Sequence, residues 1–400
     1  MLNQSVKSST RYLAIIVIVA IIASGFVFQA YANHLSNGLS ETMTDNAVSA
    51  VTVSPDMPST PVTLLGAGAT FPAPLLQTWT SQFNQLYPSI TINYNPIGSG
   101  GGIQQITAKT VDFGASDAPL TDGQLSAAKG LVLFPETLGG VAITYNLASF
   151  GIANTTILDF TGDVLVGIYM GTITHWNDPA IQALNPKVAL PSALITAVHR
   201  SDGSGTTFAF TNFLSVVNPT WASQVGYSTT VKWPVDTAAY GVGGKGNAGV
   251  AGTVANTPGA IGYVDLIYAL QNHLGVGQVK NAAGNFVYPT LQTILWAAAN
   301  ATGAPNPTDL RLHIVNAQGA QSYPICTYTY LLTYKDMSLN PDLTQQKAQV
   351  LAYFFWWAVH GGQQYSNDLF YVPLPANVVA ADEQLLMTLN YQGQPLISQS

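Results

Sequence analysis

One segment of the chain has the residue types and the spacing of an anion-binding site. Arg200 ends an apolar run, and Ser204, Gly205 and Thr206 precede helix-spaced apolar residues from 208 to 214. The first turn of a helix offers unpaired N–H groups and a partial positive charge, and an arginine beside it adds a planar pair of donors. Alone, such a segment is more often an ordinary capped turn. Its interpretation therefore depends on what the rest of the chain places beside it.

Three other predicted strand ends carry polar or acidic residues. Thr70 and Phe71 follow one apolar strand, Ser99 follows a second, and Asp117 follows a third. In parallel sheets with helical connections, ligands lie beyond the carboxyl ends of the strands. We therefore expect these residues to meet the Arg200 segment in one crevice.

The pattern of apolar residues predicts the elements that must position these side chains. Strands are expected at 62–65, 90–94 and 111–116, with a helix after Pro72 and a short one after the glycines at 100–102. A second unit follows, with strands at 141–145 and 193–198 and a helix from 164 to near Trp176. Alternating strands and helices of this kind predict an α/β fold built from doubly wound sheets.

The loops at these strand ends resemble those of a known family. Residues 65–74, 97–99, 111–117 and 200–206 are similar, in order and spacing, to the ligand loops of PstS-type phosphate-binding proteins of ABC importers. Further similar segments are 231–234, 243–247 and 258–263, and the resemblance covers about residues 62–380. It implies a type II periplasmic-binding-protein fold, with two lobes that close over one ligand. The lobes would comprise residues 62–143 with the return segment 322–400, and residues 144–321, with crossings near 140–145 and 318–329.

The resemblance also implies which residues bind phosphate. Asp117 would accept a hydrogen bond from a proton that the phosphate carries, and Asp202 would brace Arg200. Two positions depart from the family pattern: Gly100 stands where many relatives have serine, and His199 where many have a basic residue. The implied ligand set is Thr70, Phe71, Ser99, Asp117, Arg200, Ser204, Gly205 and Thr206.

The function implied is capture of inorganic phosphate outside the cell and its delivery to the permease subunits of an ABC importer. The protein would act as a monomer, without catalysis, cofactor or metal. One alternative is another tetrahedral oxyanion, such as sulfate or arsenate. A phosphate-ester hydrolase would need a nucleophile beside a base, or two metals, and Ser204 does not lie in a G-x-S-x-G elbow. A surface or adhesive protein that has kept the fold is a third class.

The amino-acid composition limits the kinds of partner that the protein can bind. Charged residues make up 8% of the chain, with 12 Lys and Arg, 19 Asp and Glu and a net charge of −7. Without a basic cluster, nucleic-acid binding is excluded, because phosphate neutralisation needs clustered cations. The single cysteine, Cys326, excludes an intramolecular disulfide and a cysteine-based metal cluster. So few titrating groups suggest an acidic habitat as a hypothesis.

The N-terminal segment predicts export. Lys7 and Arg11 precede an uncharged apolar stretch at 13–28, and a small-x-small sequence ends at Ala32. Cleavage after Ala32 and retention as an anchor on the outer face of the cytoplasmic membrane are both open. The polar, proline-containing residues 33–61 are expected to form a tether. An exported chain could carry glycans at the sequons of Asn154 and Asn300.

Three other features have simpler interpretations. Residues 241–246 satisfy G-x-G-x-x-G, but no clear strand precedes them and no acidic residue is placed to bind a ribose. We expect a lobe loop there instead of a dinucleotide site. The aromatic run 353–357 is expected to be a packed helix and not a sugar-stacking platform. Cys326 is expected to be buried.

Overall fold

The computed structural model describes residues 57–301 and 303–397. The predicted export signal and most of the predicted tether lie outside the described residues. The last tether residues are described, and they pack on the fold: Pro58 O accepts from Ser89 Oγ at 2.7 Å and Thr60 Oγ1 accepts from Gln346 Nε2 at 2.8 Å. This end of the expected tether is therefore part of the folded domain. Among the described helices, none has the length and apolar character needed to cross a bilayer.

The described chain alternates between strands and helices, as the apolar pattern predicts. The elements before the middle of the chain are β1 (Val62–Gly68), α2 (Ala73–Leu86), β2 (Ile90–Pro96), α3 (Ser99–Thr107), β3 (Phe113–Ser116), α4 (Asp122–Ala127), β4 (Leu131–Tyr145), η1 (Ala148–Phe150), β5 (Asp159–Phe160), α5 (Gly162–Tyr169), α6 (Pro179–Leu184), β6 (Thr196–Arg200), α7 (Gly205–Val217) and α8 (Pro219–Gln224). Those that follow are α9 (Pro234–Thr237), β7 (Gly241–Gly244), α10 (Gly246–Asn256), β8 (Ala260–Asp265), α11 (Leu266–Gln271), β9 (Gly275–Val276), β10 (Gln278–Lys280), β11 (Phe286–Val287), α12 (Leu291–Ala299), β12 (Cys326–Tyr334), η2 (Met337–Leu339), α13 (Gln345–Val359), η3 (Gly361–Tyr365), η4 (Asn367–Leu369), α14 (Ala376–Leu386), β13 (Asn390–Tyr391) and β14 (Gln394–Pro395).

The long strand β4 joins two sheet regions. The strand order is β2-β1-β3-β12-β4-β8-β6-β7. Residues 131–140 of β4 pair antiparallel with β12, and residues 141–145 pair antiparallel with β8. We call the part built on β2, β1, β3, β12 and residues 131–140 the first lobe, and the part built on residues 141–145, β8, β6 and β7 the second lobe. The domain boundaries at 143 and 321 remain a proposal.

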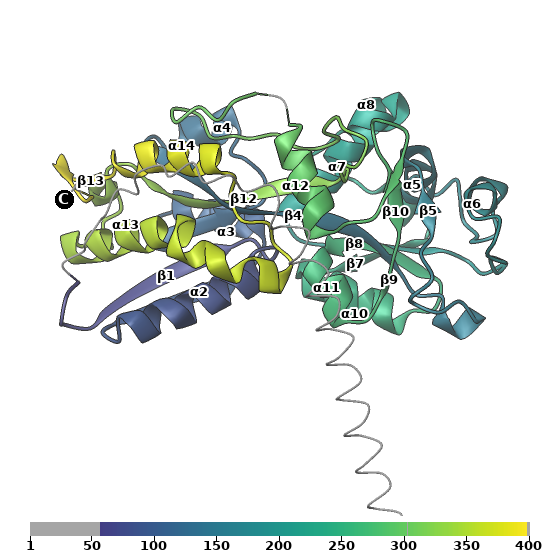
Figure 1. The fold of residues 1–400 in the computed structure, drawn as a ribbon, viewed down its shortest axis with the longest axis horizontal. Helices are drawn as coiled ribbons and strands as arrows, with labels where there is room; N and C mark the ends of the chain where they lie inside the picture. Colours follow the sequence, from purple (N-terminus) through teal and green to yellow (C-terminus); the bar gives the residue numbers. More distant parts are fainter. Residues whose placement is uncertain (1–56, 302, 398–400) are drawn as a thin grey trace, which may run out of the picture. The chain divides into compact units, whose positions relative to one another are not determined.

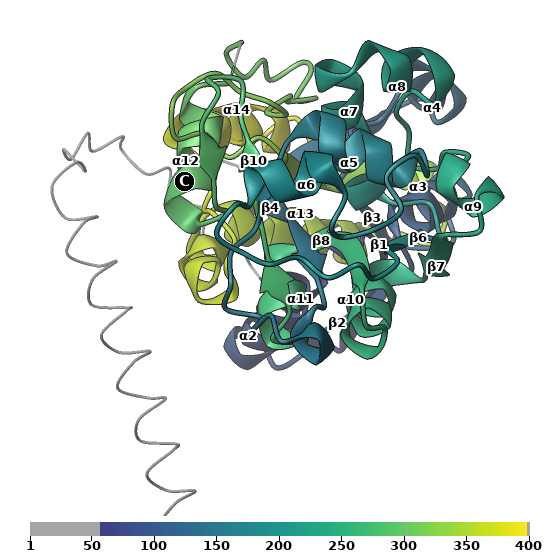
Figure 2. The same cartoon turned by 90° about the vertical axis from the view of Figure 1, so that its right-hand side faces the viewer.

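Within each lobe the strands that end at the candidate residues run parallel. β1 pairs parallel with β2 and β3, and β6 pairs parallel with β7 and β8. Helices cover both faces: Figure 2 shows α5 and α7 on one side of β8 and α10 and α11 on the other. Parallel strands therefore direct their carboxyl ends, and the helices that follow them, toward a common edge.

The first lobe is completed by the C-terminal part of the chain. Figure 1 shows the yellow helix α13 beside the purple strand β1. The aromatic run 353–357 lies in α13, and Phe354 and Phe355 are fully buried against Phe113. The predicted packed helix is confirmed. Cys326 is likewise buried, at the start of β12.

Three predicted elements need correction. β1 continues to Gly68, because glycine at 66 leaves space for the ring of Phe113, which a Cβ would meet at 2.1 Å. The helix expected to reach Trp176 ends at Tyr169, just before Gly171, which has φ 74°. Residues 241–244, expected in a loop, form the edge strand β7 along β6. Three of its four residues are glycine, so no side-chain alternation marked it as a strand.

Candidate anion-binding site

The structure brings the predicted strand ends together. Ser99, the first residue of α3, accepts hydrogen bonds at its Oγ from Asp117 N–H at 3.1 Å and from Gly205 N–H at 3.0 Å. The second of these bonds joins the two lobes. A backbone bond from Gly100 N–H to Gly203 O at 2.9 Å joins them again. The loops after β2, β3 and β6 thus meet at one place, as expected from the carboxyl ends of the predicted strands.

Three buried hydroxyl groups line this place, and their oxygens are fully used as acceptors. Thr70 Oγ1 accepts from the backbone N–H and the side-chain amide of Asn247, both at 3.1 Å. Thr206 Oγ1 accepts from Arg200 Nη1 and from the Asn247 amide, both at 3.3 Å. Ser99 Oγ accepts two N–H groups, as described. A hydroxyl has two acceptor lone pairs and one proton. Each of the three can therefore offer only its proton to a ligand.

Arg200 supplies further donors. It is 4% exposed, and its Nε and Nη2 donate to the two carboxylate oxygens of Asp202 at 2.7 and 2.5 Å. Burial acts to raise the pKa of Asp202, but the hydrogen bonds and charge of Arg200 hold it below its usual value. With one further N–H donated to Thr206, the guanidinium keeps an unused N–H on each terminal nitrogen. Asp202 fixes the plane of the guanidinium and leaves those two donors free.

Asp117 is the acceptor in this donor-rich place. The residue is 1% exposed, and its Oδ1 has no hydrogen-bond partner. The nearest contact of its Oδ2 with a hydroxyl is a long one, 3.5 Å from Ser99 Oγ. Burial raises the pKa of Asp117 to about 7, although the charge of Arg200 opposes the rise. A buried oxygen without a partner is costly, so this atom indicates a missing donor.

The other predicted residues support the junction in different ways. Ser204 caps α7, with its Oγ accepting from Thr207 N–H at 3.1 Å. The N–H of Gly205 is already donated to Ser99, and a Cβ at that position would lie 2.3 Å from Asp117 Cβ. Phe71 is fully buried, and its carbonyl accepts from Tyr371 Oη at 2.6 Å. Ser204 and Gly205 thus shape the second-lobe loop, and Phe71 is held through its peptide.

The sequence interpretation missed several residues that organise the site. Asn247 bridges Thr70 and Thr206, and its own Oδ1 accepts from Asp265 N–H at 3.0 Å. Tyr268 Oη donates to Thr70 O at 2.6 Å. A signal for Asn247 was present, because it stands at the start of a helix after a glycine-rich segment, as Ser99 does. Nothing local marked Tyr268 or Tyr371.

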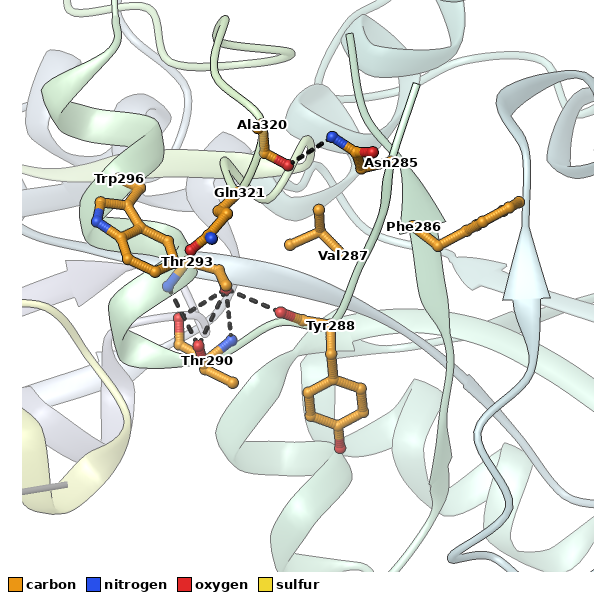
Figure 3. A pocket seen from close by; sticks show the side chains of 9 residues that line it. All are labelled: Asn285, Phe286, Val287, Tyr288, Thr290, Thr293, Trp296, Ala320 and Gln321. Carbon is orange, nitrogen blue, oxygen red and sulfur yellow. Dashed lines mark hydrogen bonds between the residues drawn. The ribbon is translucent and has the colours of Figure 1, made fainter. Parts of the chain in front are cut away.

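Two pockets lie on the described part of the molecule. One, of about 200 Å³, borders the site between the lobes and is lined by residues that include Thr70, Asp202, Lys245 and Tyr268. A larger one, of about 480 Å³, lies beside α12 (Figure 3). Its lining residues carry no charge, so it offers nothing to neutralise an anion. They are Asn285, Phe286, Val287, Tyr288, Thr290, Thr293, Trp296, Ala320 and Gln321.

A metal centre or a histidine base would be the simplest equipment for hydrolysis of a phosphate ester. Within residues 57–301 and 303–397, no three His, Cys, Asp or Glu side chains are grouped to hold a metal ion. The nearby His199 stacks on Trp233, and its Nε2 lies 2.7 Å from Asp236 Oδ1. Its Nδ1 faces Arg200 O at 3.1 Å. Both nitrogens of this imidazole are thus engaged away from the hydroxyl groups.

Comparison with known proteins identifies the family. The model of the PBP superfamily domain matches residues 55–356. A phosphate-binding protein PstS of Xylella fastidiosa is 45% identical over 318 residues, which are 80% of this chain and 83% of that protein. The PstS of Haemophilus influenzae is 43% identical over 79% of this chain and 90% of its own.

The fold is similar to that of solved binding proteins. The periplasmic phosphate-binding protein PfluDING, solved with bound phosphate, is 22% identical and has a TM-score of 0.63. The matched region covers 81% of this chain and 93% of that one. The expected periplasmic-binding-protein fold is confirmed. The chain belongs to the PBP superfamily and, within it, to the PstS family.

Proposed function

We propose that the protein captures inorganic phosphate outside the cell and delivers it to an ABC importer. The observation that carries this proposal is the division of hydrogen-bonding roles at the site. Thr70, Ser99 and Thr206 have only protons to offer, Arg200 has two unused N–H groups, and Asp117 has a buried oxygen without a donor. A ligand that fits must accept several hydrogen bonds and donate at least one. A protonated phosphate does both.

The same division disfavours sulfate. Sulfate carries no proton at neutral pH, so its oxygen would face the ionised form of Asp117 Oδ1 as one acceptor against another. Sites built around a specific hydrogen bond can reject an analogue that lacks it by as much as ~10⁴–10⁵. Arsenate has the protons of phosphate and would be accepted. The family relatives, which are named phosphate-binding proteins, support phosphate as the ligand.

The proposal includes binding without catalysis. A phosphate-ester hydrolase would need a nucleophile that a base activates. The hydroxyl oxygens here are held by N–H donors, and the carboxylate nearest to one of them, Asp117 Oδ2, makes only a long contact of 3.5 Å with Ser99 Oγ. Ser204 Oγ accepts from the first turn of its own helix. Transfer to importer permease subunits, export and action as a monomer belong to the proposal on the strength of the family.

The direct test is calorimetric titration of the purified chain with phosphate, with sulfate and with a phosphate monoester. We expect phosphate to bind far more tightly than sulfate, and the ester to be released unchanged. Equal affinity for phosphate and sulfate would contradict the proposed role of Asp117. Turnover of the ester would contradict binding without catalysis.

A further inference from the structure

A hydrogen-bonded chain connects Asp265 to the peptide of Phe71. The phenol oxygen of Tyr371 lies 2.6 Å from Phe71 O and 2.7 Å from Asp265 Oδ2. A carbonyl oxygen can only accept, and a phenol has one proton. If Tyr371 gives that proton to Phe71, the second contact is a hydrogen bond only when Asp265 carries a proton of its own. The two short distances together therefore favour a protonated Asp265.

The surroundings of Asp265 favour the neutral acid. Both Asp265 and Tyr371 are fully buried, and Asp265 Oδ1 has no hydrogen-bond partner. Among the described residues no cation pairs with Asp265; the titratable groups that act on it are Tyr371, Asp117 from the loop after β3 and Tyr268 from α11. Burial, and after it the charge of Asp117, raises the pKa of Asp265 well above its usual value. The hydrogen bond from Tyr371 and the backbone N–H groups of Leu266 and Ile267 oppose this rise in pKa, but burial outweighs them.

This chain of hydrogen bonds crosses from one lobe to the other. Asp265 ends β8 in the second lobe, whereas Phe71 follows β1 in the first lobe and Tyr371 follows η4 in the C-terminal segment. Phe71 O accepts the hydrogen bond from Tyr371. The chain of hydrogen bonds therefore fixes the peptide next to Thr70 at the anion site. The backbone N–H of Asp265 also holds Asn247, which donates to Thr70. Asp265 lies opposite Val141, where β4 passes from one lobe to the other, so its contact with Tyr371 depends on how the two lobes are placed.

We propose that protonated Asp265 is a latch between the lobes, and that lobe closure on phosphate is coupled to uptake of a proton by this residue. The inference rests on the proposed function and makes Asp265 a positioning residue, acting through Tyr371 on the Phe71 peptide. Because the proton is held more tightly in the closed form, closure is favoured at low pH. The affinity falls as the pH rises above the value at which Asp265 ionises in the open form, by up to about tenfold per pH unit.

The test compares two isosteric variants across pH. Asp265→Asn keeps an N–H that can donate to Tyr371, but it cannot ionise. Asp382→Asn is the matched control, because Asp382 is also a fully buried carboxyl group without hydrogen-bond partners and lies in α14. Phosphate affinity of the full chain is measured from pH 5 to 8.5 for both variants and wild type. Ratios to wild type cancel the ionisation of phosphate itself.

We expect the affinity of Asp265→Asn relative to wild type to rise toward alkaline pH, by up to about tenfold per pH unit, and that of Asp382→Asn to stay level. Calorimetry in buffers of different ionisation enthalpy should show less proton uptake by Asp265→Asn on binding. A level ratio for Asp265→Asn would overturn the latch while leaving phosphate capture intact.

A third variant keeps the inference testable if Asp265→Asn does not fold. Tyr371→Phe removes the bridge, so it should weaken phosphate binding even at pH 5 and flatten its pH dependence. A pH dependence like that of wild type in Tyr371→Phe would also overturn the latch. If wild type binds no phosphate at any pH, the proposed function is wrong. The latch is then judged by unfolding midpoints, because wild type should lose stability toward alkaline pH relative to Asp265→Asn.

Discussion

At the scale of single residues, selectivity depends on which hydrogen-bonding capacity the protein leaves unused. The hydroxyl oxygens of Thr70, Ser99 and Thr206 are saturated by N–H donors from their own protein. In the proposed site their protons are what they offer to the ligand, although the hydroxyl of Ser99 also makes a long contact of 3.5 Å with Asp117 Oδ2. Asp117 keeps one oxygen unpartnered for the opposite role. Under the proposed function, these hydrogen-bond roles select a protonated ligand, and Arg200 is the one cation among the proposed ligand residues.

The first prediction concerns Asp117. Asp117→Asn keeps the shape of the side chain, removes its charge and adds a donor. Sulfate should gain affinity and phosphate should lose some, because a donor now faces the protonated oxygen. The measurement is the ratio of phosphate to sulfate affinity by calorimetry. A ratio equal to that of wild type would show that selectivity arises elsewhere and that Asp117 serves only the loop before α4.

The second prediction concerns Arg200. Charge-assisted hydrogen bonds contribute roughly 1.5–3 kcal/mol each, so Arg200→Ala should weaken phosphate binding at least about tenfold. Arg200→Lys should weaken it less, since it keeps the charge but loses the planar fork that also holds Asp202. Lys232→Ala is the control, because it removes the same charge from an exposed position. Wild-type affinity in Arg200→Ala would rule out the proposed placement of the anion.

At the scale of elements, close contact between the lobes depends on glycines at the starts of helices. A Cβ at Gly100 in α3 would lie 3.0 Å from the Cα of Gly203, in the loop before α7. The contact is backbone to backbone, so neither side can yield by rotating a side chain. Gly100 is one of the two positions at which the sequence analysis expects a departure from the family pattern, and it lies at the contact between the lobes.

The third prediction follows from this contact. Gly100→Ala should hinder closure and weaken phosphate binding while leaving the unfolding midpoint close to that of wild type. Gly252→Ala is the matched control, since a Cβ there meets nothing within 4 Å in α10. Replacement of a helical glycine by alanine stabilises a helix by about 0.5–1 kcal/mol. The control variant should therefore bind phosphate normally and have a slightly higher unfolding midpoint. Normal phosphate binding by Gly100→Ala would contradict a role for this contact in closure.

The elements that sequence predicts well are those whose apolar residues repeat locally. The buried Leu75, Leu76, Trp79 and Phe83 mark α2, and strand ends at Ser99 and Asp117 could be placed from the turns that follow them. β7 escaped prediction because glycine carries no side chain to alternate. Tyr371 could not be predicted at all, since its role depends on contact with residues 300 and 106 positions away. Local sequence patterns therefore predict where strands end. They do not show which distant side chain, such as Tyr371, holds the loop at that end.

At the scale of the whole molecule, we expect ligand capture to move one lobe against the other. The donors come from both lobes, and β4 and the residues before β12 are the connections between them. The fourth prediction is that phosphate makes the molecule more compact. Small-angle scattering with and without saturating phosphate should show a smaller radius of gyration for the bound form. An unchanged radius would argue against hinge closure.

The fifth prediction concerns pH and stability. Glu136 is fully buried, its Oε2 has no partner, and burial raises its pKa to about 8. The pKa of Glu136 is higher in the folded state than in the unfolded state. The free energy of unfolding is therefore highest at acid pH, where Glu136 is protonated in both states, and it decreases as the pH rises toward 8. Wild type should therefore lose unfolding free energy from about pH 5 to 8, by at most about 1.4 kcal/mol per pH unit for this group. Glu136→Gln should lose less, as denaturant unfolding at each pH would show. An equal loss in both would contradict this origin.

The position of β12 in the sheet determines when each lobe can form during synthesis. β12 lies between β3 and β4, so the first lobe lacks a central strand until residue 334 has been made. The second-lobe strands β4, β8, β6 and β7 are all complete by residue 265. The second lobe can thus assemble on the emerging chain while the earlier β1, β2 and β3 wait, exposing apolar surface that invites aggregation. A chaperone that assists this protein would therefore be needed mainly by the strands that are synthesised first, β1, β2 and β3.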